Sequence, residues 1–200
     1  MDDMAKLGDL AVKLEKYRYY IVSALSWVVF GMIFGSMIIL GNSLILFGFG
    51  YEVLWFLLAF AGVSAGYTYG KFLKYMPMKE NSKKWIVGVL LMFVPFVASY
   101  SIIPIVFKIH SAFYFNTVWY PSLGLGLLLF GLCVEDKLKM MVYSGISIVL
   151  SSSILIPISK IAVNFKTVMA SGLLCLSMML FIYFIASIYT FFKAQKIVYA

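Results

Sequence analysis

The chain has 200 residues, of which 64% are hydrophobic, 18% aromatic and only 12% charged. Soluble domains carry about 25% charged residues, so this chain has too few charges to cover a globular surface in water. Its net charge of +8 comes from basic residues that lie between apolar blocks, which argues against a face that binds nucleic acid. The composition therefore predicts an all-α integral membrane protein that sits in a lipid bilayer.

The first sixteen residues predict a cytoplasmic amphipathic helix over 1–16. Apolar positions recur at three- and four-residue spacing, and charged positions form the opposite face. The apolar positions are Met4, Leu7, Ala11 and Leu14, and the charged positions are Lys6, Asp9, Lys13 and Lys16. Three interpretations stay open: a helix in the lipid headgroups, a docking helix for a soluble partner, or an extension of the first span that packs on the protein's own loops.

Six apolar blocks follow, each long enough to cross the hydrocarbon, which takes about 20 residues. They are Tyr19–Gly41, Phe47–Gly70, Trp85–Phe107, Ala112–Val134, Met140–Ile161 and Val168–Phe192. The blocks predict a six-transmembrane-helix bundle over residues 17–200. The fourth block contains Pro121, and residues 108–118 belong either to this span or to the outer surface.

The basic residues predict the orientation of the bundle. Thirteen of the sixteen lie in the N-terminal segment, the second and fourth connections and the C-terminal tail, which leaves Lys108, Lys160 and Lys166 for the other side. Because basic residues concentrate in cytoplasmic loops, both termini are predicted to be cytoplasmic and the protein to lie in the plasma membrane. Trp119 and Tyr120 fall near a predicted interface, where amphipathic rings settle.

Small residues recur at four-residue spacing in the first two spans. They are Gly31 and Gly35 in the first span and Ala59, Gly62, Gly66 and Gly70 in the second. Helices in lipid associate by close packing, which small residues allow. We expect a glycine zipper, in which the two spans form an antiparallel hairpin with glycine face against glycine face. A homodimer seam or a sliding contact is the alternative.

Two spans combine prolines with hydroxyl groups. Pro95 and Pro104 in the third span and Pro157 in the fifth are predicted to kink their helices. The neighbouring polar side chains are Ser99, Tyr100, Ser101, Ser151, Ser152 and Ser153. They serve either as hydrogen-bonding groups between helices or as the lining of a polar substrate path through broken helices.

Reactive groups are scarce. Glu52 begins the second span, where a carboxylate complements the helix dipole. It is expected to be a wetted outer-face charge near Lys108 or Lys160, and a role in the capture of a ligand or cation is the alternative. His110 is the sole histidine, and one imidazole does not hold zinc, so we expect no metal site. We also expect no cofactor and no enzymatic activity, because the sequence contains no hydrolase or nucleotide-binding motif.

Six spans, two cytoplasmic termini and an amphipathic entry helix are similar in layout to the permease subunits of ABC-type exporters. This similarity of layout implies a transport subunit that is energised by a cytoplasmic ATPase or works with another membrane subunit. The alternative is a non-catalytic accessory, assembly or immunity-type membrane protein, alone or as a homodimer.

Overall fold

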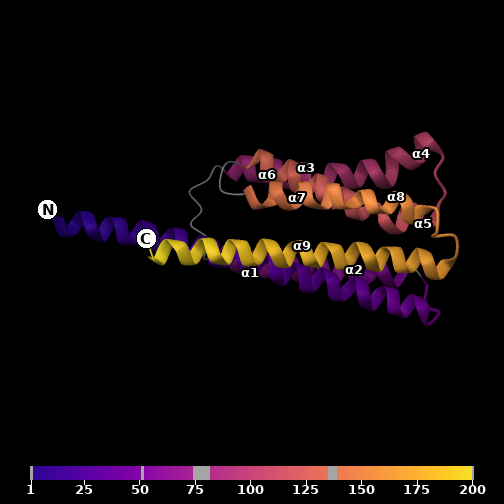
Figure 1. Ribbon diagram of the computed structural model, residues 1–200, viewed down its shortest axis with the longest axis horizontal. Coiled ribbons are helices and arrows are strands. Elements are labelled where there is room, and N and C mark those ends of the chain that lie inside the picture. Colours follow the sequence, from indigo (N-terminus) through magenta and orange to yellow (C-terminus); the bar gives the residue numbers. More distant parts are fainter. Residues whose placement is uncertain (1, 51, 74–81, 135–138, 200) are drawn as a thin grey trace. The chain divides into compact units, whose positions relative to one another are not determined.

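In the computed structural model, the described residues (2–50, 52–73, 82–134 and 139–199) form helices and no β-strand. The long helices are α1 (Asp2–Leu46), α2 (Glu52–Leu73), α3 (Ser82–Val97), α6 (Trp119–Cys133), α7 (Lys139–Ser151) and α9 (Phe165–Tyr199). The short ones are η1 (Ala98–Ile102), α4 (Ile103–Phe107), α5 (Ala112–Thr117), η3 (Ser152–Ile154) and α8 (Leu155–Ser159) (Figure 1). The predicted all-α fold is confirmed.

The helices fall into two compact units. Unit 1 comprises Met1–Lys79 with Tyr183–Ala200, and unit 2 comprises Glu80–Ile182. Unit 1 therefore contains α1, α2 and the C-terminal half of α9. Unit 2 contains the helices from α3 to α8 and the first half of α9.

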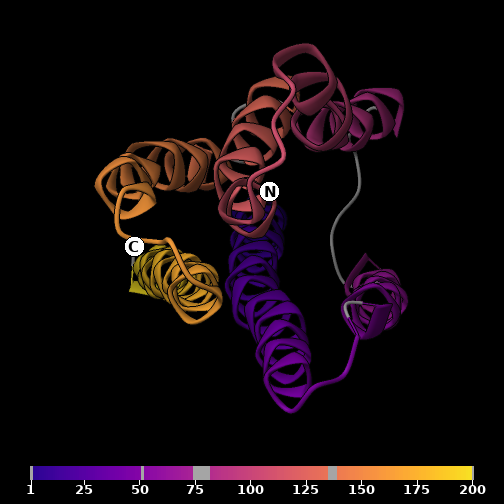
Figure 2. The ribbon, with the colours of Figure 1, turned by 90° about the vertical axis from the view of Figure 1, so that its right-hand side faces the viewer.

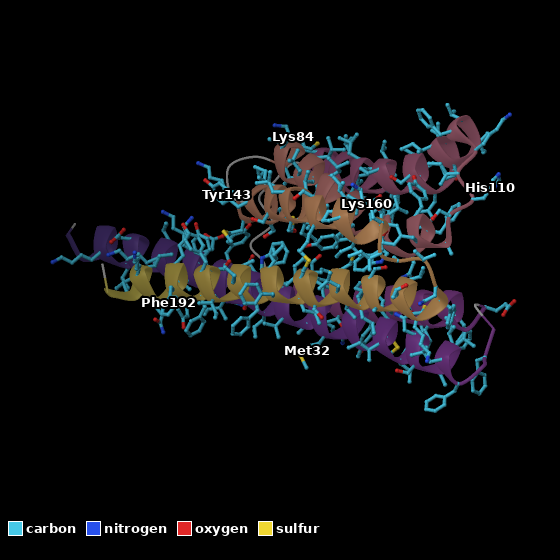
Figure 3. The ribbon with its side chains drawn as sticks, turned by 45° about the vertical axis from the view of Figure 1, so that its right-hand side comes forward. Met32, Lys84, His110, Tyr143, Lys160 and Phe192 are labelled. Atoms are coloured by element: carbon cyan, nitrogen blue, oxygen red, sulfur yellow. The ribbon has the colours of Figure 1, made fainter. Side chains whose placement is uncertain are left out.

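Four of the described helical stretches are long and apolar enough to cross a membrane. They are Lys6–Leu46, Ile86–Phe107, Lys139–Ser159 and Phe165–Ile197. Large apolar side chains stand exposed along them, such as Met32 and Phe192, which are 67% and 57% exposed (Figure 3). Such a surface is stable in lipid and prone to aggregation in water. The helices thus support the prediction of a membrane protein.

Helix α1 joins the N-terminal segment to the first predicted span without a break. It has 45 residues and would measure about 68 Å at a rise of 1.5 Å per residue, about twice the thickness of the hydrocarbon. In the N-terminal part, Lys13 pairs with Asp9 at 3.5 Å. The continuity agrees with an extension of the first span, but Leu7, Leu10 and Leu14 are exposed rather than packed on loops.

Within unit 1, α1 packs against the C-terminal half of α9. The Ser187 hydroxyl donates to the Ala24 carbonyl at 3.0 Å, and the rings of Trp27 and Tyr183 meet edge to face with their centroids 4.9 Å apart. Trp27, which follows Ala24 in α1, contacts Tyr183, which precedes Ser187 in α9. The two helices are therefore antiparallel where they pack.

The predicted packing face of α2 is not buried. Ala59, Gly62 and Gly66 are exposed, and a Cβ atom built on either glycine would meet nothing within 4 Å. Helix α2 instead buries Ala61 and Ala65, about 100° away around the helix. The predicted contact of glycine with glycine inside the hairpin is wrong at these positions, because alanine methyls already allow close packing and occupy the inward face.

The other glycines of the predicted zipper are Gly31 and Gly35 in α1 and Gly70 in α2. Gly31 and Gly35 are buried in α1, on the helix face that carries Ala24 and Trp27. The surroundings of Gly70 lie outside the described residues. The small-residue face of the first span is thus buried, but the exposed glycines of α2 do not pack against it.

Unit 2 contains a tight glycine contact that the four-residue spacing of small residues does not predict. Helix α6 lies between α3 and α7 (Figure 2). A Cβ atom on Gly145 of α7 would lie 2.6 Å from the Gly124 carbonyl oxygen and 2.7 Å from the Leu128 amide nitrogen. On the other side of α6, a Cβ atom on Gly126 would lie 2.6 Å from the Met92 carbonyl oxygen. These glycines let three helix backbones approach closely.

Candidate functional site: a junction of broken helices

Three helical discontinuities occur in unit 2. Helix α3 passes into the π-helical turn η1, α5 and α6 are separated at Val118, and α7 passes into the 3₁₀ turn η3. Side chains of α5 and α6 on either side of Val118 are hydrogen-bonded to the other two discontinuities. We call this region, formed by η1 and residues 114–122 and 148–152, the helix junction.

The π-helical turn is explained by Pro104. The Ile103 amide donates to the Ala98 carbonyl, five residues back. The next residue, Pro104, has no N–H, so the Ser99 carbonyl has no π-helical donor. The Tyr114 hydroxyl donates to this carbonyl at 2.7 Å. A side chain of α5 thus replaces the missing backbone donor, in a segment where an unpaired carbonyl would be unfavourable.

The two η1 residues Ser99 and Tyr100 form hydrogen bonds with the end of α5 and the start of α6. Ser122 Oγ lies 2.9 Å from Ser99 Oγ and 2.7 Å from the Val118 carbonyl oxygen. The Tyr100 hydroxyl donates to the Phe115 carbonyl at 3.2 Å. Because Ser99 and Ser122 are both buried, their contact joins two helices away from lipid.

Tyr120 joins α6 to the end of α7. Its side chain, predicted to lie at an interface, is fully buried, and its hydroxyl oxygen is 2.6 Å from Ser151 Oγ. Ser151 and Ser152 also donate to the Ile148 carbonyl at 3.0 and 2.7 Å, and Ser153 donates to the carbonyl three residues back at 2.8 Å. Hydroxyls that bond back to their own helix in this way favour a bend.

Asn116 joins α5 to the start of α9. Its side-chain Nδ2 donates to the Val168 carbonyl at 2.6 Å. The backbone carbonyl of Asn116 accepts a hydrogen bond from Trp119 Nε1 at 3.0 Å. Gly172 leaves room for this amide, because a Cβ atom there would lie 2.5 Å from Asn116 Nδ2. The hydrogen bonds of the helix junction therefore reach a fourth helix.

Each predicted kink lies close to one of these discontinuities. Pro95 is buried inside α3, three residues before η1, and Pro104 lies in the first turn of α4, directly after η1. Pro157 lies in α8, three residues after η3. Of the predicted polar residues, Ser101 and Ser153 are exposed. Ser101 belongs to the helix junction as part of η1, together with Ser99, Tyr100, Ser151 and Ser152, whereas Ser153 lies just beyond it.

The three residues of the predicted outer-face charge cluster, Glu52, Lys108 and Lys160, are exposed. Glu52 lies in the first turn of α2 in unit 1, whereas Lys108 and Lys160 belong to unit 2. Lys108 ends α4 with a left-handed backbone, φ 50°. His110 is exposed in the connection after α4 (Figure 3). Because the acid and the lysines belong to different units, the outer-face charge cluster stays a prediction.

The helix junction is polar but uncharged. Among the described residues, no group of three or more His, Cys, Asp or Glu could hold a metal ion. The one buried side-chain atom of the described residues that lacks a hydrogen bond, Asn42 Oδ1, lies in α1 of unit 1. The buried hydroxyls of the helix junction are all engaged by protein groups. Such a satisfied network fixes the positions of helices.

The sequence predicts no role for Tyr114, Asn116 or Ser122 of the helix junction, and for Tyr120 it predicts a membrane interface. All four lie in the fourth apolar block, which is the least uniform of the six. The sequence signal for these residues is the concentration of polar side chains around Pro121 within an apolar block. That block pairs with three other segments, which spacing along one helix does not reveal.

Comparison with known proteins gives no relative for this chain. No protein-family model, curated protein or solved structure matches it. Its function is therefore argued from its own residues and their packing.

Proposed function

We propose that the protein is a non-catalytic accessory protein of the plasma membrane that binds another membrane-spanning helix through one face of α2. The observation that carries this proposal is the exposed small-residue face formed by Ala59, Gly62 and Gly66. A Cβ atom on either glycine would meet open space. The partner is a second copy of this chain or another membrane subunit.

Packing within unit 1 gives no reason for glycine at positions 62 and 66. Alanine would fit in the open space and would favour the helix by about 1 kcal/mol at each position. A partner helix in lipid, by contrast, gains from a bare backbone because close approach increases van der Waals contact. The two glycines are therefore better explained by an intermolecular contact.

The helix junction also favours an accessory protein over a carrier. A polar path needs groups that can bind a substrate, whereas Ser99, Ser122, Tyr120 and Ser151 are hydrogen-bonded to one another or to backbone carbonyls. The hydrogen-bonding interpretation of these hydroxyls is thus the one that the contacts support.

We expect Gly66→Leu to weaken association without unfolding unit 1. The leucine would project into open space in the isolated chain but would push a partner helix away from the α2 backbone. The measurement is energy transfer between labelled copies in bilayers, together with recovery of membrane partners in mild detergent. Val63→Leu is the matched control, because Val63 is 74% exposed and gains a single methylene. Association that survives Gly66→Leu would show that this face is not an interface.

We further propose six spans with both termini in the cytoplasm, because the basic residues concentrate on one side. Cysteine at position 111, in the connection before α5, should react with a membrane-impermeant maleimide added outside intact cells. Cysteine at position 81, which lies outside the described residues, should react after the membrane is opened. External labelling at position 81 would overturn the orientation.

A transport subunit energised by a separate ATPase is the second candidate. The observation that favours it is the set of three hydrogen-bonded discontinuities in unit 2, because broken helices hold the substrate in many transporters. Stoichiometric copurification with a nucleotide-binding protein would favour transport. Copurification with a membrane protein that binds no nucleotide would favour the accessory role.

A further inference from the structure

An apolar groove of about 380 Å³ lies in unit 1 between α1 and the C-terminal half of α9. Its walls are Ile21 and Leu25 from α1 and Ile188, Phe191 and Phe192 from α9. Phe192 stands at the outer surface of α9 (Figure 3). The groove is open along one side, so a membrane-embedded unit 1 would present it to lipid.

The floor of the groove has no free polar group. It is formed by Ala24 and Ser187, which are both buried and are joined by the hydrogen bond from the Ser187 hydroxyl to the Ala24 carbonyl. Because this bond satisfies both groups, the groove suits a hydrocarbon chain.

One end of the groove is polar. Tyr17 and Arg18 lie one turn before Ile21 on α1, and Gln195 and Lys196 lie one turn after the two phenylalanines on α9. Residues three or four apart are neighbours on a helix surface. Because α1 and α9 are antiparallel here, the four polar residues flank the same end of the groove.

The two cations at this end are available to an anion. Arg18 and Lys196 are exposed, and in the described part of the chain neither has a carboxylate within 4 Å. Glu15, one turn before Arg18, is the nearest acid along α1 and is also exposed. A third cation, Lys193, lies over the Tyr20 ring at 4.8 Å from its centroid.

We propose that this groove binds one anionic phospholipid, with an acyl chain along the apolar walls and the phosphate between Arg18 and Lys196. A guanidinium group forms paired hydrogen bonds with phosphate oxygens. The Tyr17 hydroxyl and the Gln195 amide add neutral donors for the rest of the headgroup. A zwitterionic phospholipid offers the same chain, but its choline brings a positive charge towards the two cations.

The proposal requires unit 1 to lie in a membrane, and it does not require partner binding through α2. A monomeric protein that retains the lipid would support the lipid site and contradict partner binding through α2. Free phosphate has no hydrocarbon chain to fill the groove. Binding of a soluble anion would therefore not depend on the apolar side chains of the groove.

The test is native mass spectrometry of the full chain in mild detergent, titrated with phosphatidylglycerol or with phosphatidylcholine of the same acyl chains. We expect one phosphatidylglycerol to bind at least about tenfold more tightly than phosphatidylcholine, and the double variant Arg18→Gln/Lys196→Gln to lose this preference. Lys160→Gln/Lys166→Gln is the charge-matched control in unit 2 and should keep it.

A second pair of variants tests the groove itself. Phe192→Ala should weaken the binding of both lipids, whereas Phe60→Ala, which removes a similarly exposed ring from α2, should leave it unchanged. Equal affinity for the two lipids, or a preference that survives loss of Arg18 and Lys196, would overturn the proposal. Preference for phosphatidylglycerol that is insensitive to Phe192→Ala would show binding to surface charge alone and would also overturn it.

Discussion

Replacing Gly145 by alanine should destabilise unit 2. The new methyl carbon would lie 2.6 Å from the Gly124 carbonyl oxygen and 2.7 Å from the Leu128 amide nitrogen. Both atoms belong to the α6 backbone, so the methyl group cannot be accommodated by rotation of a side chain. Overpacking of a filled site costs roughly 1–3 kcal/mol, and we expect a rigid backbone contact to lie at the upper end.

The matched control is Gly66→Ala, which makes the same chemical change on an exposed helix face. Nothing lies within 4 Å of the added carbon there, and alanine favours a helix over glycine by about 1 kcal/mol. Gly66→Ala should therefore leave the unfolding free energy unchanged or slightly raised. The measurement is denaturant or thermal unfolding in mild detergent. Equal stabilities for the two variants would contradict the tight contact between α6 and α7.

The membrane character of the fold could be predicted because it is a property of whole segments. Length and hydropathy averaged over about 20 residues tolerate errors at single positions, and α1 and α9 contain the first and sixth predicted blocks in full. The continuity of α1 from Asp2 to Leu46 was harder to predict from the sequence. An amphipathic pattern does not specify whether a helix bends where the charges end.

The glycine contacts could not be predicted, because spacing along one helix does not specify its neighbour. Gly62 and Gly66 have the four-residue repeat but lie open, whereas Gly145 stands without such a repeat and has backbone atoms against it. In lipid, hydrophobicity does not distinguish a face that meets protein from one that meets hydrocarbon. Only the arrangement of the second helix makes this distinction.

The helix junction was predictable in part. The prolines predict kinks, and the hydroxyl of Ser99 between Pro95 and Pro104 is predicted to bond between helices or to line a polar path. The group that satisfies the Ser99 carbonyl is the Tyr114 hydroxyl, which lies in another helix and forms part of no motif. Aromatic residues near span ends suggested interface anchors, and this pattern concealed the buried position of Tyr120.

Tyr120 is the side chain of the helix junction whose loss should have the largest effect. It is fully buried, and Tyr120→Ala would leave a cavity between α6 and α7. Removal of a large buried ring costs about 3–5 kcal/mol. Dispersion contacts are what hold helices together in lipid, so the cavity is not compensated by the surrounding membrane.

Tyr120→Phe separates the ring from its hydroxyl group. It removes the 2.6 Å contact with Ser151, but Ser151 retains the Ile148 carbonyl as acceptor. Hydrogen bonds between membrane helices average about 0.6 kcal/mol, and we expect a loss of that size. Tyr143→Ala is the control, because Tyr143 is 55% exposed on α7 (Figure 3) and its loss should be nearly neutral.

The expected order of stability is therefore parent and Tyr143→Ala together, then Tyr120→Phe, then Tyr120→Ala, measured by unfolding in the same detergent. A Tyr120→Phe variant as unstable as Tyr120→Ala would mean that the hydroxyl group, rather than the packed ring, joins the two helices. The helix junction would then depend on polar contacts that can be exchanged, as a substrate path requires. The predicted order instead describes a rigid junction, in which hydrogen bonds set the positions of the broken helices and ring packing supplies most of the stability.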